Sequence, residues 1–277
     1  MQDNDTLQRF LFEGAPVRGE VVHLDATWTA LLERHEYPAP VRDLLGEMMA
    51  ACALLAATIK FQGAITMQVQ GDGPISLMVV ECTSGRTLRG MAHWDGEVPT
   101  QNMAAQFGEG RLAITIDPGE GRERYQGIVE LQGERLADTL DGYLERSEQL
   151  STRLWLAADG HRAAGMLLQK LPDRETPDAD AWDRFLTLGA TLSEKELLDL
   201  PSREVIHRLF HEEDLRLFEP QRLSFRCSCS RQRVAETLRG LGREEVMDIL
   251  EEQGSVSVQC EFCNQRYEFD SVDAEQI

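Results

Sequence analysis

The sequence predicts an α+β protein with three parts: an N-terminal domain of mixed strands and helices (1–175), an amphipathic helical linker (176–222) and a small cysteine-rich module with a β-hairpin (223–277). Strand-like segments are followed by helical ones without regular alternation, which favours α+β over a doubly wound fold. A stretch rich in proline and charge at 171–178 indicates a domain boundary. Four of the six cysteines lie in the last 51 of the 277 residues, which marks a separate module.

The N-terminal domain is predicted from residues that alternate between apolar and polar. Ile65, Met67 and Val69 have polar neighbours, and Gly-Asp-Gly-Pro at 71–74 turns the chain into a second strand over 75–82. Further strands are predicted at 17–22, 87–93, 112–116, 125–131, 152–157 and 166–171. Helical periodicity predicts helices near 29–36, 41–60 and 136–149.

The predicted linker has apolar residues at helical spacing among many charges between 180 and 219. This pattern predicts two or three short amphipathic helices, with Ser193 and Ser202 as N-caps, and Glu196 completes a capping box with Ser193. An ordinary helical connector would give the same pattern. The apolar residues are Phe185, Leu186, Leu188, Leu192, Leu197, Leu198, Val205, Ile206, Leu209 and Phe210.

The overall charge restricts the partners. Lysine and arginine total 28 against 48 acidic residues, a net charge of −20, which argues against a broad surface for nucleic acid or anionic membranes. The longest uncharged apolar stretch, 48–59, is shorter than the ~20 residues that cross a bilayer. The first five residues lack the basic and apolar regions of a signal peptide, so we expect a cytoplasmic protein.

The four clustered cysteines have the spacing of a metal site. Cys227 and Cys229 have one residue between them, and Cys260 and Cys263 follow after an insert of 30 residues. Two close pairs of thiolates separated by such an insert predict a tetrahedral zinc site with all four as ligands. The insert is predicted to form helices over 232–241 and 244–252, a stop at Gly254 and a strand over 256–259, with a return strand at 267–269. Bound metal would hold so small a module folded.

The spacing of the first pair is unusual, since structural zinc sites separate cysteines by two to four residues. A disulfide between Cys227 and Cys229 would depart from relaxed geometry and be easily reduced, which suits a redox switch. A structural zinc site without any redox role remains the alternative.

Two other binding or catalytic classes fit less well. A zinc ribbon for nucleic acid would need basic residues, but 227–277 holds 11 acidic residues, 5 arginines and no lysine. His207 and His211 have the i, i+4 spacing of a metalloprotease, but Arg208 follows His207 where a glutamate general base is needed. We expect these histidines to lie on a helix surface.

The remaining motifs predict no enzyme. Cys52 and Cys82 lack the signature of a nucleophile and are expected to be small buried hydrophobic residues. Gly-Asp-Gly at 71–73 lacks the Lys-Ser/Thr of a phosphate-binding loop and is predicted to be a turn.

The order of these motifs resembles the Hsp33 family, the redox-regulated holdase chaperones of bacteria, over nearly the whole chain. Besides the Cys-x-Cys and Cys-x-x-Cys pairs, the matching segments are Arg9-Phe10-Leu11-Phe12, Val17-Arg18-Gly19-Glu20, Gln70-Gly71-Asp72-Gly73-Pro74, Arg124-Tyr125-Gln126-Gly127, Tyr143-Leu144-Glu145-Arg146-Ser147-Glu148-Gln149, Leu167-Leu168-Gln169 and His211-Glu212-Glu213.

The resemblance implies a two-state, ATP-independent chaperone. The reduced form would hold one zinc ion per chain through the four thiolates and be inactive. Oxidation would form the disulfides Cys227–Cys229 and Cys260–Cys263, release zinc, unfold the C-terminal module and loosen the linker. The oxidised form, which the resemblance suggests is a homodimer, would then bind unfolded client proteins.

Overall fold

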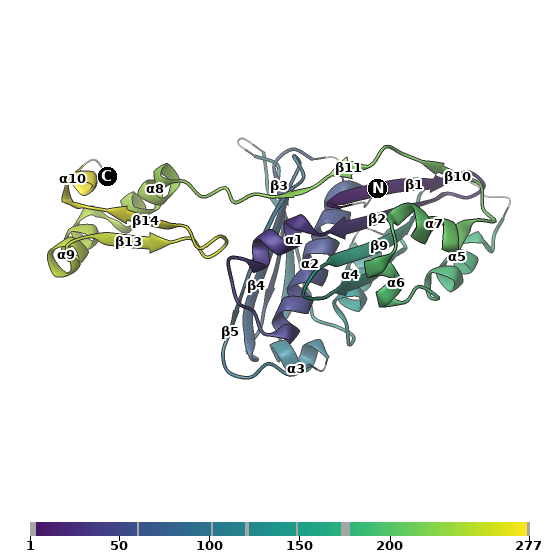
Figure 1. Ribbon diagram of the computed structural model, residues 1–277, viewed down its shortest axis with the longest axis horizontal. Helices are drawn as coiled ribbons and strands as arrows, with labels where there is room; N and C mark the ends of the chain where they lie inside the picture. The colour runs from purple at the N-terminus through teal and green to yellow at the C-terminus, as the bar shows by residue number, and fades with distance from the viewer. Residues whose placement is uncertain are drawn as a thin grey trace. The chain divides into compact units, whose positions relative to one another are not determined.

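The computed structural model describes residues 4–59, 61–100, 102–119, 122–147, 149–172 and 178–275 (Figure 1). By their internal contacts, the residues form two compact units, Met1–Phe225 and Arg226–Ile277.

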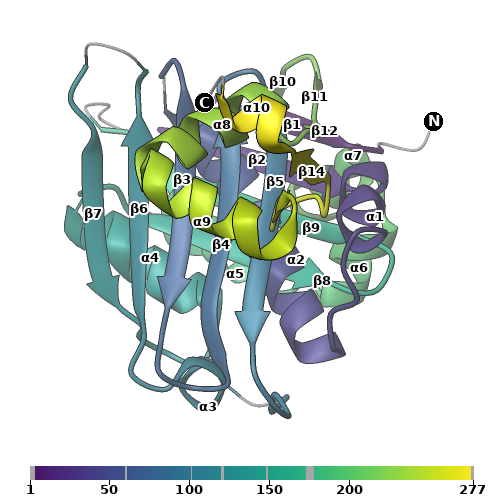
Figure 2. The same ribbon diagram turned by 90° about the vertical axis from the view of Figure 1, so that its left-hand side faces the viewer.

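The first unit contains two β-sheets. One has the strand order β10-β1-β2-β9-β8, with β11 also paired to β1, and the other has the order β12-β5-β4-β3-β6-β7 (Figure 2). The described strand pairs are antiparallel except β12 with β5. Their bounds are β1 Thr6–Phe12, β2 Val17–Leu24, β3 Ala64–Gln70, β4 Ile75–Thr83, β5 Thr87–Trp94, β6 Arg111–Asp117, β7 Tyr125–Glu130, β8 Thr152–Ala158, β9 Ala163–Lys170, β10 Leu215–Leu217, β11 Gln221–Arg222 and β12 Ser224–Phe225.

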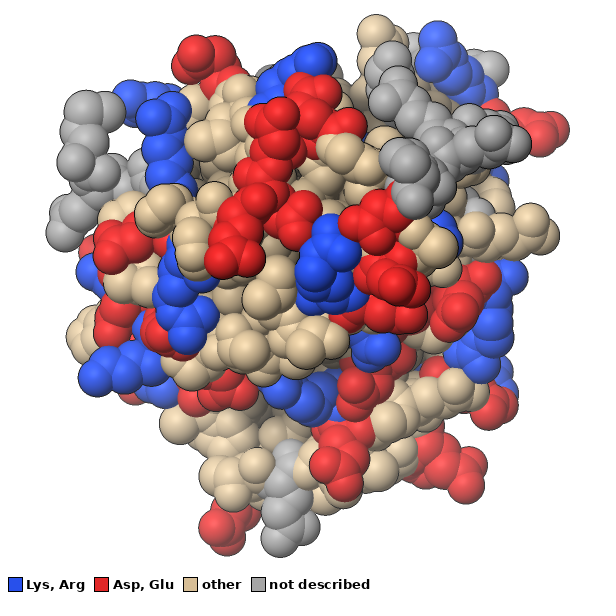
Figure 3. Space-filling model, turned by 90° about the vertical axis from the view of Figure 1, so that its right-hand side faces the viewer, with Lys and Arg blue, Asp and Glu red and all other residues tan. Residues whose placement is uncertain are grey.

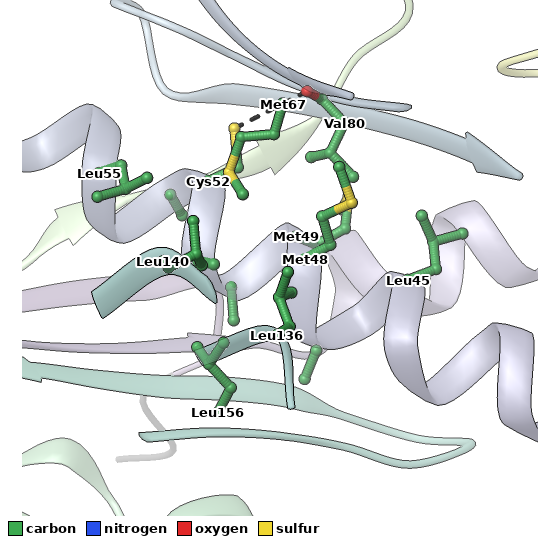
Figure 4. Packing of buried hydrophobic residues seen from close by; sticks show 14 of the residues in the cluster. Leu45, Met48, Met49, Cys52, Leu55, Met67, Val80, Leu136, Leu140 and Leu156 are labelled. Atoms are coloured by element: carbon green, nitrogen blue, oxygen red, sulfur yellow. Dashed lines mark hydrogen bonds between the residues drawn. The ribbon is translucent and has the colours of Figure 1, made fainter. Parts of the chain in front are cut away.

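Helix α2, Ala39–Thr58, lies between the two sheets and forms the centre of the main core. Thirteen of its 20 residues are buried, because small and apolar side chains surround the whole helix. Figure 4 shows Met67 and Val80 of one sheet on one side of it and Leu156 of the other sheet on the opposite side. Three more helices complete this part of the unit: α1 Ala26–Leu32, α3 Met103–Phe107 and α4 Leu136–Ser147.

The opposite face of the β1-β2-β9-β8 sheet is covered by the helices of the predicted linker. They are α5 Ala181–Gly189, α6 Glu194–Asp199 and α7 Ser202–Phe210. Their apolar side chains form a second core with Phe10, Phe12 and other residues of the sheet. The ring of Phe185 stacks on that of Phe12, with centroids 3.8 Å apart. Each helix has nine residues or fewer, so it depends on this packing for its stability.

One buried histidine connects these helices to the sheet. The Nδ1 of His23 lies 3.0 Å from the hydroxyl of Ser202, and its Nε2 lies 2.8 Å from the carbonyl oxygen of Leu197. Because that carbonyl can only accept, Nε2 carries the proton and Ser202 donates to Nδ1. Ser202 is therefore a buried partner of the sheet. Its predicted role as N-cap is wrong, since Pro201 occupies that position.

The second unit is small. It contains α8 Arg231–Leu241, α9 Arg243–Gln253, the hairpin β13 Val256–Gln259 with β14 Arg266–Phe269, and α10 Ser271–Glu275. Its buried apolar residues, among those that the structure describes, are Leu238, Val246, Leu250, Val256 and Phe269. A core of this size supplies little folding free energy by itself.

The predicted α+β class, the helices of the linker region and the C-terminal hairpin are confirmed. Ser193 forms the predicted capping box with Glu196, and Gly254 ends α9 in a left-handed conformation. The helix predicted over 29–36 instead spans Ala26–Leu32, and the one predicted to end at 149 ends at Ser147. Lys60 and most of the boundary at 171–178 lie outside the described residues. The three-part division remains a prediction.

No helix among the described residues is long and apolar enough to cross a membrane. Figure 3 shows the end of the molecule where β10 lies in Figure 1. Among the described residues on this face, basic side chains are interspersed with acidic ones rather than gathered into one broad patch.

Glu20 on β2 gives the fold a testable pH dependence. Its side chain is 1% exposed, and its Oε2 has no hydrogen-bond partner among the residues that the structure describes. Burial raises the pKa of this carboxyl from 4.5 to about 7, although Arg18, Arg9 and Arg86 oppose the shift. The folded protein therefore retains this proton to higher pH than the unfolded chain, so the contribution of Glu20 to stability falls as the pH rises from 4.5 to about 7.

Replacing Glu20 with glutamine removes this titration. At about pH 8 the variant should exceed the wild type in free energy of unfolding by up to about 3 kcal/mol, and the difference should vanish near pH 4.5. Urea unfolding at the two pH values measures both differences. An equal difference at both would show that Glu20 does not titrate in this range.

Candidate metal centre

The first two cysteines lie in the loop that leads into α8. Ser230 caps this helix, because its hydroxyl accepts a hydrogen bond from the backbone N–H of Arg233 at 3.2 Å. The helix start thus fixes the end of the loop that carries Cys227 and Cys229. Both cysteines are partly buried.

The second two cysteines lie in the tight turn of the β13–β14 hairpin. The carbonyl oxygen of Cys260 accepts from the backbone N–H of Cys263 at 3.3 Å and of Asn264 at 2.8 Å. Asn264 adopts a left-handed conformation, with φ of 58°, which closes the turn. The N–H of Cys260 donates to Gln265 at 3.0 Å. The turn holds both thiols at the same end of the hairpin.

These two loops bring the four sulfur atoms together. All four Sγ atoms lie within 4.8 Å of one another. The Sγ of Cys227 is 3.6 Å from that of Cys260, and the Sγ of Cys229 is 3.3 Å from that of Cys263. A tetrahedral zinc–thiolate site, with bonds of about 2.3 Å, has S···S edges of about 3.8 Å. The four thiols therefore match in size and chemistry what a Zn²⁺ ion requires.

The surroundings of the thiols shift their pKa values in different directions. Burial alone would raise the pKa of Cys227, but hydrogen bonds from the Cys229 backbone amide and from neighbouring thiols lower it below its ordinary value. Burial raises the pKa of Cys260 and of Cys263.

Tyr267 contacts one of the four cysteines. The sequence predicted only that this residue lies in the return strand of the hairpin. Its hydroxyl donates to the Sγ of Cys229 at 3.2 Å. This hydrogen bond, together with desolvation, raises the pKa of Tyr267 to about 12, so the phenol remains a donor. The sequence signal for this contact was that Tyr267 follows Cys263 by only four residues, in the predicted return strand. In the structure this strand is paired with β13.

The other two cysteines are structural, as predicted. Cys52 and Cys82 are 0% and 1% exposed. The Cys52 thiol donates to the carbonyl oxygen of Val80 at 4.0 Å (Figure 4). Burial raises the pKa of Cys52 well above its ordinary value and that of Cys82 to about 12. Both thiols therefore lack the nucleophilic thiolate that reacts with oxidants.

The remaining sequence candidates occupy the positions expected of them. His207 and His211 lie on the exposed side and at the end of α7, with ring centroids 5.6 Å apart. Residues 71–73 form the predicted turn between β3 and β4, where the N–H of Gly73 donates to Phe107 at 2.8 Å.

Comparison with known proteins agrees with the resemblance found in the sequence. The family model described as Hsp33 protein matches residues 5–270. The chain belongs to the Hsp33 family. Curated relatives named 33 kDa chaperonin include that of Nitrosococcus oceani, 52% identical over 100% of this chain and 95% of its own, and that of Methylobacillus flagellatus, 51% identical with the same coverage.

A solved structure supports the fold. The crystal structure of the 33 kDa chaperonin (heat shock protein 33 homolog) from Thermotoga maritima superimposes with a TM-score of 0.86 at 23% identity, covering 98% of this chain and 97% of that one. The chain is therefore a member of a chaperone family with the Hsp33 fold, and it carries four clustered cysteines.

Proposed function

We propose that this chain is a redox-regulated, ATP-independent holdase that binds unfolding and oxidatively damaged proteins and prevents their aggregation. It is inactive when reduced and zinc-bound and active when oxidised. The observation that carries the proposal is the convergence of four thiols within 4.8 Å in a unit whose own core is small. Membership of the Hsp33 family supports the chaperone activity itself.

In the reduced state, Cys227, Cys229, Cys260 and Cys263 would hold one zinc ion as thiolates. The metal supplies a cross-link between the loop before α8 and the hairpin turn. Structural zinc contributes ~10–16 kcal/mol to the folding of small modules, whereas a core of five buried apolar residues leaves little net stability once the entropy of folding is subtracted.

Oxidation would remove the ligands from the metal. For each disulfide an S–S bond forms as two thiolate sulfurs lose two electrons in total. Hydrogen peroxide accepts these electrons together with two protons from the solvent, and its O–O bond breaks to give two water molecules. We infer the pairs Cys227–Cys229 and Cys260–Cys263, which the resemblance to the Hsp33 family implies. The closest sulfur pairs in the folded module, Cys227 with Cys260 and Cys229 with Cys263, are 33 and 34 residues apart in sequence. These pairs would separate once the module unfolds. Neighbouring cysteines remain close in the open module, since their loops are short.

Loss of the folded module would then release the helices α5, α6 and α7. Their apolar side chains would provide a client-binding surface, and their many acidic residues would keep that surface soluble. We further infer that the oxidised form is a homodimer and that the protein acts in the cytoplasm, where thiols are normally reduced.

A client aggregation assay tests the proposed activity. Light scattering from a heat-denaturing client should fall when the oxidised protein is added and remain high with the reduced, zinc-loaded protein. ATP should change neither result. Equal suppression by both forms would instead support the alternative function, a constitutive zinc-stabilised module for protein interaction without redox switching.

A further inference from the structure

A hollow of about 440 Å³ in the first unit has an unusual lining for so acidic a protein. Three arginines line it: Arg9 of β1, Arg86 of the β4–β5 turn, and Arg122. Among the described residues, its walls contain no acidic side chain. The other lining residues are Ala56, Ala57, Ile59, Phe61, Gln62, Thr83 and Ser84.

The fold holds two of these arginines close together. Arg9 lies on the face of β1 that points toward the main core, two residues after buried Leu7, and its guanidinium lies over the ring of Phe218 at 5.5 Å. Arg86 has a φ of 62°, and its N–H donates to Thr83 at 2.8 Å in a tight turn. Burial and the charge of Arg9 both lower the pKa of Arg86, so the two cations repel each other.

The described part of the chain supplies little negative charge to balance them. Its ion pairs include none to Arg9, Arg86 or Arg122. The Nε of Arg9 is buried without a hydrogen-bond partner. The nearby carboxyl is that of Glu20, whose pKa of about 7 leaves it only partly ionised at neutral pH. An uncompensated, partly buried cluster of cations is costly unless an anion completes it.

A second hollow on the same unit provides the contrast. It is larger, about 710 Å³, and is lined by one arginine, Arg111, together with the carboxylates Asp72, Glu109 and Glu130. Carboxylates therefore share the lining of this second hollow with its arginine, whereas the described lining of the first hollow contains no carboxylate.

We propose that the hollow lined by Arg9, Arg86 and Arg122 is a binding site for a multiply charged phosphate anion. Guanidinium groups bind phosphate oxygens through two parallel N–H···O bonds, and the local excess of positive charge would attract such an anion despite the net charge of −20. The hydroxyl of Ser84 and the amide of Gln62 supply further polar groups in the wall.

Calorimetric titration of the reduced full-length protein with pyrophosphate, at fixed ionic strength in chloride, tests the site. The wild type should bind one anion per chain. Arg86→Asn, which tolerates the left-handed backbone, and Arg9→Gln should each weaken binding about tenfold or more, the effect of losing a charge-assisted hydrogen bond. Arg111→Gln, in the acidic hollow, should bind like the wild type.

ATP in a parallel titration distinguishes the source of the phosphate. Pyrophosphate binding at least as tight as ATP binding would identify a free inorganic anion, and tighter ATP binding would identify the phosphate tail of a nucleotide; either result supports the site. The absence of pyrophosphate binding at millimolar concentration would overturn the proposal. Equal affinity in Arg86→Asn, Arg9→Gln and Arg111→Gln would also overturn it.

Discussion

Replacing Cys229 with serine is expected to leave residues 226–277 unfolded while the unit of residues 1–225 keeps its structure. The variant lacks one of the four proposed ligands, and the five buried apolar residues of the small unit cannot compensate for a loss of several kcal/mol. Metal analysis should show severely weakened zinc binding. Hydrogen exchange should show protection lost in α8, α9 and the β13–β14 hairpin but kept in the β3–β6 strands.

The matched control is Ser228→Ala, which changes an exposed side chain between the two cysteines and leaves all four thiols in place. It should bind zinc like the wild type. Full stoichiometric zinc binding at high affinity by Cys229→Ser would remove Cys229 from the ligand set.

Replacing Phe185 with alanine is expected to activate the reduced, zinc-loaded protein. The Phe185 ring stacks on Phe12 and lies 6.1 Å from the ring of Phe210, so its loss leaves a cavity in the core that holds α5 and α7. Such a truncation costs about 3–5 kcal/mol. Helices of nine residues are marginal by themselves and depend on this packing. Hydrogen exchange should speed up over residues 181–210, and client aggregation should be suppressed without oxidant.

Thr187→Ala, on the exposed side of the same helix, is the control and should stay inactive when reduced. Faster exchange over 181–210 in Phe185→Ala without any gain in client binding would mean that the linker helices are not the switch. A variant that strengthens this packing should conversely remain inactive after both disulfides have formed.

The sequence predicted those strands in which one face is buried, because alternation between apolar and polar residues records that burial. It missed β1, where Gln8 and Arg9 interrupt the alternation: Gln8 is 2% exposed and donates to the backbone of Phe218. It also missed β10, β11 and β12, which have two or three residues each and exist through pairing with β1 and β5. Segments of two or three residues are too short to show an alternation of apolar and polar residues.

The start of α1 shows a second limit of prediction from the sequence. The carboxylate of Asp5 accepts hydrogen bonds from the backbone N–H groups of Asp25, Ala26 and Thr27, at 2.8 to 3.1 Å. These contacts satisfy the free amides at the helix N-terminus from about 20 residues away in sequence. The helix predicted near 29–36 therefore began three residues too late.

The cluster of four cysteines could be predicted because its residues are of one chemical type at the spacing of a metal site. The arginine-lined hollow could not be, since Arg9, Arg86 and Arg122 belong to distant segments that only the fold brings together. The same holds for the contact of Tyr267 with Cys229.

The most direct test of the redox switch is a peroxide titration of the zinc-loaded protein in which zinc release, free thiols and client binding are measured on the same samples. We expect one zinc released per chain, four of the six thiols lost, and Cys52 and Cys82 still reduced because they are buried and their pKa values are raised. Suppression of client aggregation should rise with zinc release. Client binding that is complete before any zinc is released, or zinc release with all six thiols intact, would contradict the account.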